Sequence, residues 1–96
     1  MKTNKRIVCK DGVSLSVQAN RFAYCTPKEN DAAIYTHVEV GYIENQFGGV
    51  YLTPNDEWSN YGDSDYGIYA YVPAALVLAF IEKHGGMVDG ELPPMA

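Results

Sequence analysis

Hydrophobic and polar residues alternate most clearly over residues 13–19, directly after the dipeptide Asp11-Gly12. Apolar residues also fill part of the segment that precedes this dipeptide. An Asp-Gly pair between two such segments is typical of a two-residue type I′ turn, because both turn positions need a positive φ. Residues 5–19 are therefore predicted to form a β-hairpin.

A two-residue turn also determines which residues pair across this hairpin. It places Val8 opposite Leu15, so both side chains are expected to face the core. Ile7 and Cys9 are then expected to point away from the core, because successive side chains of a strand alternate between its two faces.

Three more segments have the pattern of strands, namely residues 34–42, 49–53 and 66–72. The first and the third alternate over most of their length, and short connections favour antiparallel pairing. The residues expected to face the core are Ile34, Thr36, Val38, Val40, Tyr42, Ile68, Ala70 and Val72.

A single helix is predicted after the last of these strands. Pro73 suits the first helical position, apolar residues then recur at helical spacing, and Gly85-Gly86 ends the pattern. The fold class is therefore α+β, with an antiparallel sheet of four to five strands, formed by the N-terminal hairpin and a meander, and one C-terminal helix packed on one face. We expect a single domain over residues 1–89 and a flexible tail over residues 90–96, where two prolines prevent further helix.

Charge is distributed unevenly along the 96 residues. Residues 1–28 contain six bases and one acid, whereas residues 29–96 contain one base and eleven acids. The eight tyrosines exceed what a small core needs, so they are expected either at an interface or on a half-covered sheet face. An acidic surface of this kind favours a basic partner.

The acidic and aromatic residues are concentrated over residues 55–66, a long connection between two predicted strands. Long loops in small domains are often functional, although a solvated polar loop with its aromatic rings against the sheet is the simpler alternative. Carboxylates and aromatic anchors together suit a basic groove on a partner protein. The predicted partner-binding residues are Asp56, Glu57, Trp58, Tyr61, Asp63, Asp65 and Tyr66.

Metal binding and catalysis find little support in the sequence. Cys9, Cys25, His37 and His84 lie too far apart for the close pairs of a structural zinc site, and the acids after residue 62 lack the glycine and glutamate of a calcium loop. His37 and Glu39 share one predicted strand face, but no nucleophile accompanies them. We therefore expect no metal, no cofactor and no enzymatic activity.

The apolar segments are too short for targeting or membrane insertion. Residues 7–9 cannot form the apolar region of a signal peptide, and the longest apolar run, residues 72–81, is about half the length of a membrane span. These lengths predict a soluble protein in the cytoplasm, with Cys9 and Cys25 as reduced thiols.

Several short strings resemble small, mostly uncharacterised proteins encoded by bacteriophages and prophages. The resemblance spans roughly residues 9 to 86, with nothing specific between Glu44 and Tyr66. It implies a phage setting inside a bacterial host, where short acidic chains often inhibit host enzymes or defence systems. The strings are Cys9-Lys-Asp-Gly12, Ser16-Val-Gln-Ala19, Tyr24-Cys-Thr-Pro27, Val38-Glu-Val-Gly41, Tyr69-Ala-Tyr-Val-Pro73 and Ile81-Glu-Lys-His-Gly-Gly86.

The first functional hypothesis is a non-enzymatic, anti-CRISPR-like inhibitor or interaction protein. Its acidic and aromatic surface would block a basic, nucleic-acid-binding site of a host defence or transcription complex without touching nucleic acid itself. The alternatives are a small dimeric protein that sequesters a nucleotide-like signal, with Arg6, Lys10 and Arg21 facing phosphate, and an accessory structural protein of the virion. A homodimer is compatible with each of these hypotheses.

Overall fold

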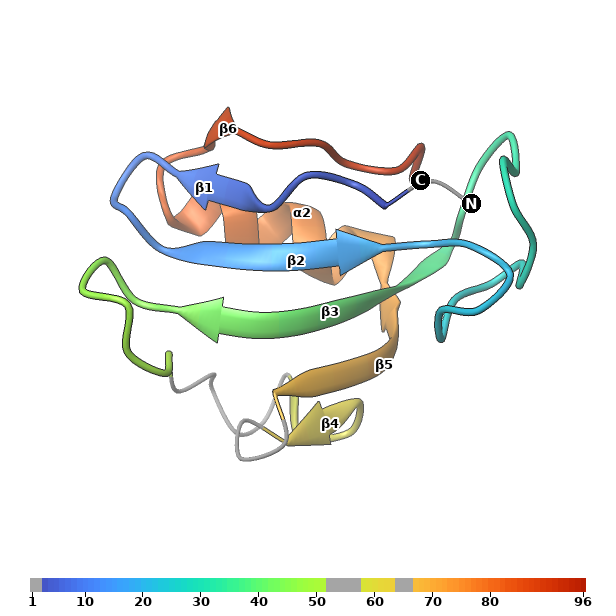
Figure 1. The fold of residues 1–96 in the computed structure, drawn as a ribbon, viewed down its shortest axis with the longest axis horizontal. Helices are drawn as coiled ribbons and strands as arrows, with labels where there is room; N and C mark the ends of the chain where they lie inside the picture. The colour runs from blue at the N-terminus through green and yellow to red at the C-terminus, as the bar shows by residue number, and fades with distance from the viewer. Residues whose placement is uncertain (1–2, 52–57, 64–66) are drawn as a thin grey trace.

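A six-stranded antiparallel sheet dominates the part of the chain that the computed structural model describes, residues 3–51, 58–63 and 67–96 (Figure 1). The strand order is β4-β5-β3-β2-β1-β6. The helix α2 (Ala74–Lys83) follows β5 near the C-terminal end of the chain, and together with the sheet it gives the expected α+β fold. The strands are β1 (Ile7–Cys9), β2 (Ser14–Gln18), β3 (His37–Glu44), β4 (Gly62–Asp63), β5 (Ile68–Pro73) and β6 (Met87–Asp89).

The helix α2 lies across one face of the sheet, behind the strands in the view of Figure 1. Pro73 is the last residue of β5 and the N-cap of α2, one position before the first helical position predicted for it. After the C-cap His84, Gly85 and Gly86 have φ of +92° and +91° and end the helix as predicted. Val77, Phe80 and Ile81 are buried against the core cluster of the sheet. This helix therefore divides the sheet into a covered face and an open face.

The N-terminal hairpin forms as predicted, but its turn is one residue longer than expected. The amide of Cys9 donates to the carbonyl of Val13 at 2.8 Å, and the amide of Gly12 donates to the carbonyl of Cys9 at 2.9 Å. Three residues therefore form the loop, with Gly12 in the left-handed conformation at φ +94°, which is a common three-residue alternative to the type I′ turn.

The longer turn shifts the register and exchanges the two faces of β1. Ile7 pairs with Leu15, and Val8 pairs with Ser14. Ile7 and Cys9 are buried in the core, whereas Val8 is only half-buried, which is the reverse of the expected orientation. The predicted register was wrong because a shift of one residue moves every side chain of a strand to the other face.

A β-bulge in β3 breaks the alternation that the sequence pattern predicts. Ser16 of β2 pairs with Gly41 and Ser14 pairs with Glu44, so three residue steps of β3 match two of β2. The additional residue is Tyr42, whose φ of +49° turns its side chain to solvent. Ile43 takes the core position instead, so the predicted inward orientation of Tyr42 was wrong.

A second bulge does the same in β5. Val38 of β3 pairs with Val72 and Val40 pairs with Tyr69, so three residue steps of β5 match two of β3. Tyr71 has a φ of +53° and is exposed. The buried residues of β5 are therefore Tyr69 and Val72, and Ile68 and Ala70 do not take the core positions predicted for them.

The remaining expectations concern the edges of the fold. The predicted strand at residues 49–53 contributes an isolated bridge between Glu44 and Val50, within its described part. Ile34 is exposed, although alternation placed it in the core. Among the described residues, no helix is long and apolar enough to cross a membrane. Cys9 and Cys25 are buried free thiols.

The C-terminal segment after β6 lies along the domain and does not form the loose tail that its prolines suggested. The amide of Glu91 donates to the carbonyl of Lys5 at 3.1 Å. Tyr35 binds this segment twice, since its amide donates to the carbonyl of Pro94 at 2.8 Å and its carbonyl accepts from the amide of Ala96 at 3.2 Å. Leu92 and Met95 also pack against the core, so residues 90–96 belong to the domain.

Candidate interaction surface

Three exposed tyrosines stand on or beside strands β3 and β5. Tyr42 belongs to β3, Tyr71 to β5, and Tyr24 to the connection that follows β2. Their exposed fractions are 61%, 43% and 49%, respectively, although a buried aromatic side chain would stabilise the fold more. We name these three residues the tyrosine face.

Tyr42 is fixed in its unusual conformation by backbone contacts on both sides. Its amide donates to the carbonyl of Gly67 at 2.6 Å, and its carbonyl accepts from the guanidinium of Arg6. Its ring lies over Gly67, where an added Cβ would come within 2.9 Å of Cδ1 of the ring. Glycine at position 67 therefore makes room for the ring.

Tyr71 is held against Tyr24 in a comparable way. The amide of Tyr71 donates to the carbonyl of Tyr24 at 3.1 Å, and the two ring centroids lie 5.9 Å apart with the planes tilted by 50°. The amide of Tyr24 donates to Oε2 of Glu39 at 3.0 Å, and Nζ of Lys28 lies 5.0 Å from the Tyr24 ring centroid. The pair is therefore ordered before any partner binds, with a carboxylate beside it.

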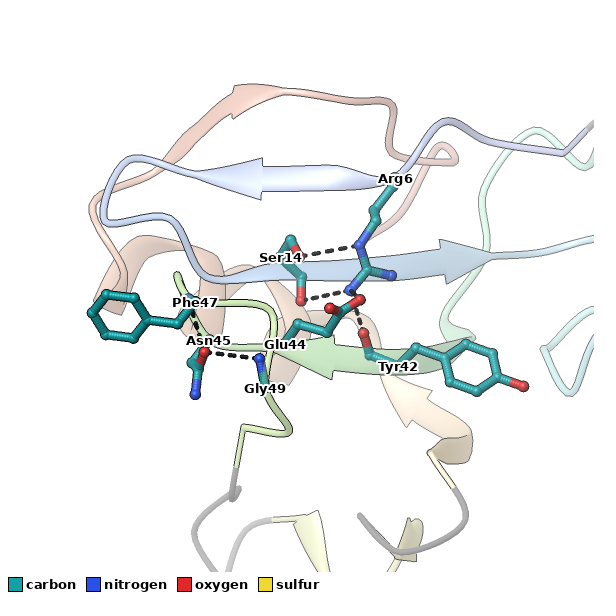
Figure 2. Close-up of polar contacts among 7 residues, drawn as sticks. All are labelled: Arg6, Ser14, Tyr42, Glu44, Asn45, Phe47 and Gly49. Atoms are coloured by element: carbon teal, nitrogen blue, oxygen red, sulfur yellow. Dashed lines mark hydrogen bonds and ion pairs between the residues drawn. The ribbon is translucent and has the colours of Figure 1, made fainter.

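Arg6, directly before β1, contacts both β2 and β3 at the base of the first bulge (Figure 2). Its Nε donates to Oγ of Ser14 at 3.0 Å, and its terminal nitrogen lies 3.1 Å from Oε1 of Glu44. The same nitrogen also donates to the carbonyl of Tyr42, which the bulge removes from the ladder. Arg6 therefore stabilises the bulge, and its charge is paired with Glu44.

Another exposed aromatic residue, Phe47, lies in the turn after β3. Oδ1 of Asn45 accepts hydrogen bonds from the amides of Phe47 at 2.9 Å and Gly49 at 3.0 Å, which orders the turn (Figure 2). Phe47 is 87% exposed, and Figure 2 shows its ring pointing away from the ring of Tyr42. This turn does not extend the tyrosine face.

The structure describes only part of the predicted partner-binding set. Asp56, Glu57, Asp65 and Tyr66 lie outside the described residues. Asp63 lies in β4, and its backbone pairs with Ile68 of β5. Tyr61 is partly buried against the core, and its amide donates to the carbonyl of Trp58 at 3.0 Å.

Trp58 is not a surface residue. It is 1% exposed, and its ring meets those of Tyr69 at 5.3 Å and Phe80 at 5.4 Å between centroids. The prediction that Trp58 contacts a partner was wrong, because the ring fills the core between β5 and α2. Of the tyrosines that do reach the surface, Tyr42 was predicted to face the core, whereas Tyr71 lies outward as its alternation with Val72 indicated. The signal for the exposure of Tyr42 was the apolar residue Ile43 directly after it, because strict alternation does not place two neighbouring residues in the core.

The candidate catalytic residues already have structural partners. Nδ1 of His37 lies 2.9 Å from Oγ1 of Thr36, and Glu39 accepts from the Tyr24 amide. Burial, with a smaller effect of the Asp11 carboxylate, raises the pKa of the Cys9 thiol, which disfavours a reactive thiolate. Within the described ranges, no three His, Cys, Asp or Glu residues come together as a metal site.

His84 forms a close side-chain pair with Asp11. Its Nδ1 lies 2.6 Å from Oδ2 of Asp11, and its ring is 8% exposed between Tyr51 and Phe80. The hydrogen bond with His84, followed by that from the Val13 amide, holds the pKa of Asp11 below its usual value. The pair joins the end of α2 to the β1–β2 turn.

The three bases proposed to face phosphate do not form one site. Lys10 lies in the turn before β2, whereas Arg21 follows the other end of β2 (Figure 1). Arg6 is paired with Glu44. This arrangement gives no support to a nucleotide site built from these residues.

Comparisons with known protein families, with curated proteins and with solved structures find no match to this chain.

Proposed function

We propose that this protein is a small non-enzymatic interaction protein that binds a basic surface of a protein partner through its tyrosine face. The observation that carries the proposal is that two of the three tyrosines occupy left-handed backbone positions. A bulky residue in this region costs about 1–3 kcal/mol and persists only where its surroundings enforce it. Strain of this kind is concentrated at functional sites.

The bulges have a specific effect on tyrosine. Without them, alternation would direct Tyr42 into the core, where the ring would contribute to stability. With them, Tyr42 and Tyr71 present rigid aromatic rings at the surface. Ordered tyrosines are favoured at binding hot spots, since they bury a large area and lose little conformational entropy on binding.

Charge indicates the kind of partner. The chain has a formal net charge of −5, and the Glu39 carboxylate is bound to the backbone amide of Tyr24. Tyrosine rings also attract cations, as this molecule shows within itself where Lys28 lies over Tyr24. Lysine and arginine side chains of a partner would meet both a carboxylate and aromatic rings on this surface.

The partner class follows from the resemblance to phage proteins together with this chemistry. A bacterial defence or transcription complex with a nucleic-acid-binding groove offers lysines and arginines at high density. Occupying that groove would inhibit the complex. We further propose that the acids of residues 55–66 add negative charge to the surface that meets the basic groove of the partner. These acids are Asp56, Glu57, Asp63 and Asp65.

Photo-crosslinking tests the surface directly. Benzoylphenylalanine replaces Tyr24, and a matched control replaces Leu78, which is 43% exposed on α2 and therefore on the covered side of the sheet. Irradiation in a bacterial lysate is expected to give a defined adduct at position 24 that weakens as salt rises, and none at position 78. Equal adducts at both positions, or none at position 24, would contradict the proposal.

A further inference from the structure

A cavity of about 270 Å³, which no residue of the tyrosine face lines, lies between the connection that follows β2 and the C-terminal segment. Three asparagines, Asn4, Asn20 and Asn30, line it on one side. Tyr35, Leu92 and Pro94 are among its apolar lining residues. The volume is slightly below the range of about 300–1,000 Å³ typical of drug-sized ligands, so it suits a small molecule.

Asn20 provides a buried polar group to the cavity lining. It is 8% exposed, and its Oδ1 accepts hydrogen bonds from the amides of Phe22 at 2.8 Å and Ala23 at 3.0 Å. These two bonds fix the orientation of the side-chain amide. Its Nδ2 group donates to no described residue, so the two N–H donors of this group are free to bind a molecule in the cavity.

Asn30 and Asn4 complete the polar side. Oδ1 of Asn30 accepts from the amide of Arg21 at 3.0 Å, which leaves its Nδ2 without a described partner. Asn4 is 8% exposed, its Nδ2 makes a long contact of 3.5 Å to the carbonyl of Val17, and its Oδ1 is left as an acceptor. The Gln18 side chain holds the backbone of Asn4 through two hydrogen bonds of 2.8 Å.

The opposite side is apolar and rigid. Tyr35 is 2% exposed, and its hydroxyl donates to the carbonyl of Glu29 at 2.7 Å and accepts from the amide of Ala32 at 3.2 Å. Its amide donates to the carbonyl of Pro94, which fixes the C-terminal segment as a wall of the cavity. The cavity is therefore formed before a ligand arrives.

We propose that this cavity binds a neutral, hydroxyl-rich ring of the size of one monosaccharide. Hydroxyl groups both donate and accept, so they can satisfy the Nδ2 donors of Asn20 and Asn30 together with the Oδ1 acceptor of Asn4. The C–H face of such a ring packs against Tyr35 and Pro94. Burying hydroxyls requires partners of this kind, which an entirely apolar cavity lacks.

Charge excludes an anionic ligand. The cavity lining contains no lysine or arginine, and its one charged residue is the carboxylate of Asp31 at the exposed rim. A phosphate or carboxylate would lie beside this acid without a cation to balance it. The inference is independent of the proposed function, because no residue of the tyrosine face lines the cavity.

The test is a titration followed through the side-chain amide NMR signals of the three asparagines. D-glucose, D-galactose and N-acetyl-D-glucosamine are each added to about 50 mM, which saturates a site with a dissociation constant near 1 mM. At least one sugar is expected to shift the signals of Asn4, Asn20 and Asn30 in a saturable way. Glucose 6-phosphate and arginine amide serve as anionic and cationic probes.

Two variants remove a donor and keep the fold. Asn20→Asp and Asn30→Asp retain the Oδ1 acceptor of each local hydrogen bond, and each replaces the Nδ2 donor with a carboxylate oxygen. Each is expected to weaken sugar binding about tenfold or more, because a ligand hydroxyl loses its donor. Asn45→Asp is the matched control, since Asn45 makes the same kind of local bonds in the turn after β3.

Each outcome of this experiment decides the proposal. Saturable shifts with the neutral sugars, lost in the two cavity variants and kept in Asn45→Asp, support it. The absence of shifts with all three sugars overturns it, as does unchanged affinity in both cavity variants. Tighter binding of glucose 6-phosphate or arginine amide than of any neutral sugar overturns the ligand class.

Discussion

The two faces of one sheet follow different physical rules. On the covered face, Val17, Val38, Val40 and Val72 have no exposed area, and α2 closes the core over them. On the open face, Tyr42 and Tyr71 project from positions with positive φ. The covered face thus minimises exposed apolar area, whereas the open face retains exposed aromatic rings at a conformational cost.

The difference shows how a strand can depart from alternation at a single residue. Each bulge inserts one additional residue and leaves a tyrosine exposed, while Val40, Ile43, Tyr69 and Val72 on either side of the bulges keep core positions. The core is therefore preserved on both sides of each bulge. Exposure of the tyrosine is a local feature that the rest of the fold stabilises.

The largest expected effect lies on the covered face, at Trp58. Replacing Trp58 with alanine removes the ring that packs against Tyr69 and Phe80, and we expect the free energy of unfolding to fall by about 3–5 kcal/mol. Urea denaturation measures the change. Phe47→Ala is the control, because an exposed ring of similar size is expected to contribute within about 0.5 kcal/mol.

A loss below about 1 kcal/mol for Trp58→Ala would mean that the ring is not in the core. The covered face would then not bury Trp58, and Trp58 would again be a candidate partner contact.

The next effect tests the first bulge through two neighbouring residues. Ile43→Ala is expected to cost about 2–5 kcal/mol, because Ile43 takes the core position that alternation assigned to Tyr42. Tyr42→Asn is expected to cost nothing, because asparagine tolerates positive φ better than tyrosine. The same denaturation series reports both values, and a larger loss for Tyr42→Asn than for Ile43→Ala would contradict the bulge.

A smaller expected effect on stability depends on pH and arises from the pair of Asp11 and His84 at the end of α2. The His84 hydrogen bond lowers the pKa of Asp11, so this carboxylate contributes stability above the ordinary Asp pKa of about 3.9. The contribution is lost as pH falls through the lowered pKa of the folded state. Asp11→Asn should therefore reduce the loss of stability on acidification below about pH 4.

Thermal unfolding between neutral and acidic pH provides the measurement. Glu82→Gln, a carboxyl-to-amide change at an exposed position of α2, serves as the control. An acid dependence of Asp11→Asn that equals that of the wild type would show that the His84 pair does not contribute to acid sensitivity.

Local sequence signals predicted the elements better than the faces. Asp11-Gly12 identified the hairpin, and Pro73 with Gly85-Gly86 bounded the helix, because turn and cap preferences act over a few residues. The hairpin register depended on whether the loop held two or three residues, which the same Asp-Gly pair allows. That single ambiguity reversed the predicted faces of Ile7, Val8 and Cys9.

The candidate site was less predictable than the fold. Periodicity assigns Tyr42 to the core, and only the contacts of Gly67 and Arg6, distant in sequence, hold it outside. The acidic residues next to Trp58 in the sequence favoured a surface position for it, whereas its ring is buried in the core. Side-chain exposure at these positions depends on tertiary contacts, which composition and spacing do not contain.

The most direct test of the central claim is the free energy of unfolding of the double variant Tyr42→Asn/Tyr71→Asn. If the two tyrosines are held in strained positions for binding and not for stability, the variant is expected to unfold with a free energy equal to that of the wild type or up to about 2 kcal/mol higher. A decrease of more than about 1 kcal/mol would contradict the account, because it would show that the exposed rings stabilise the fold itself.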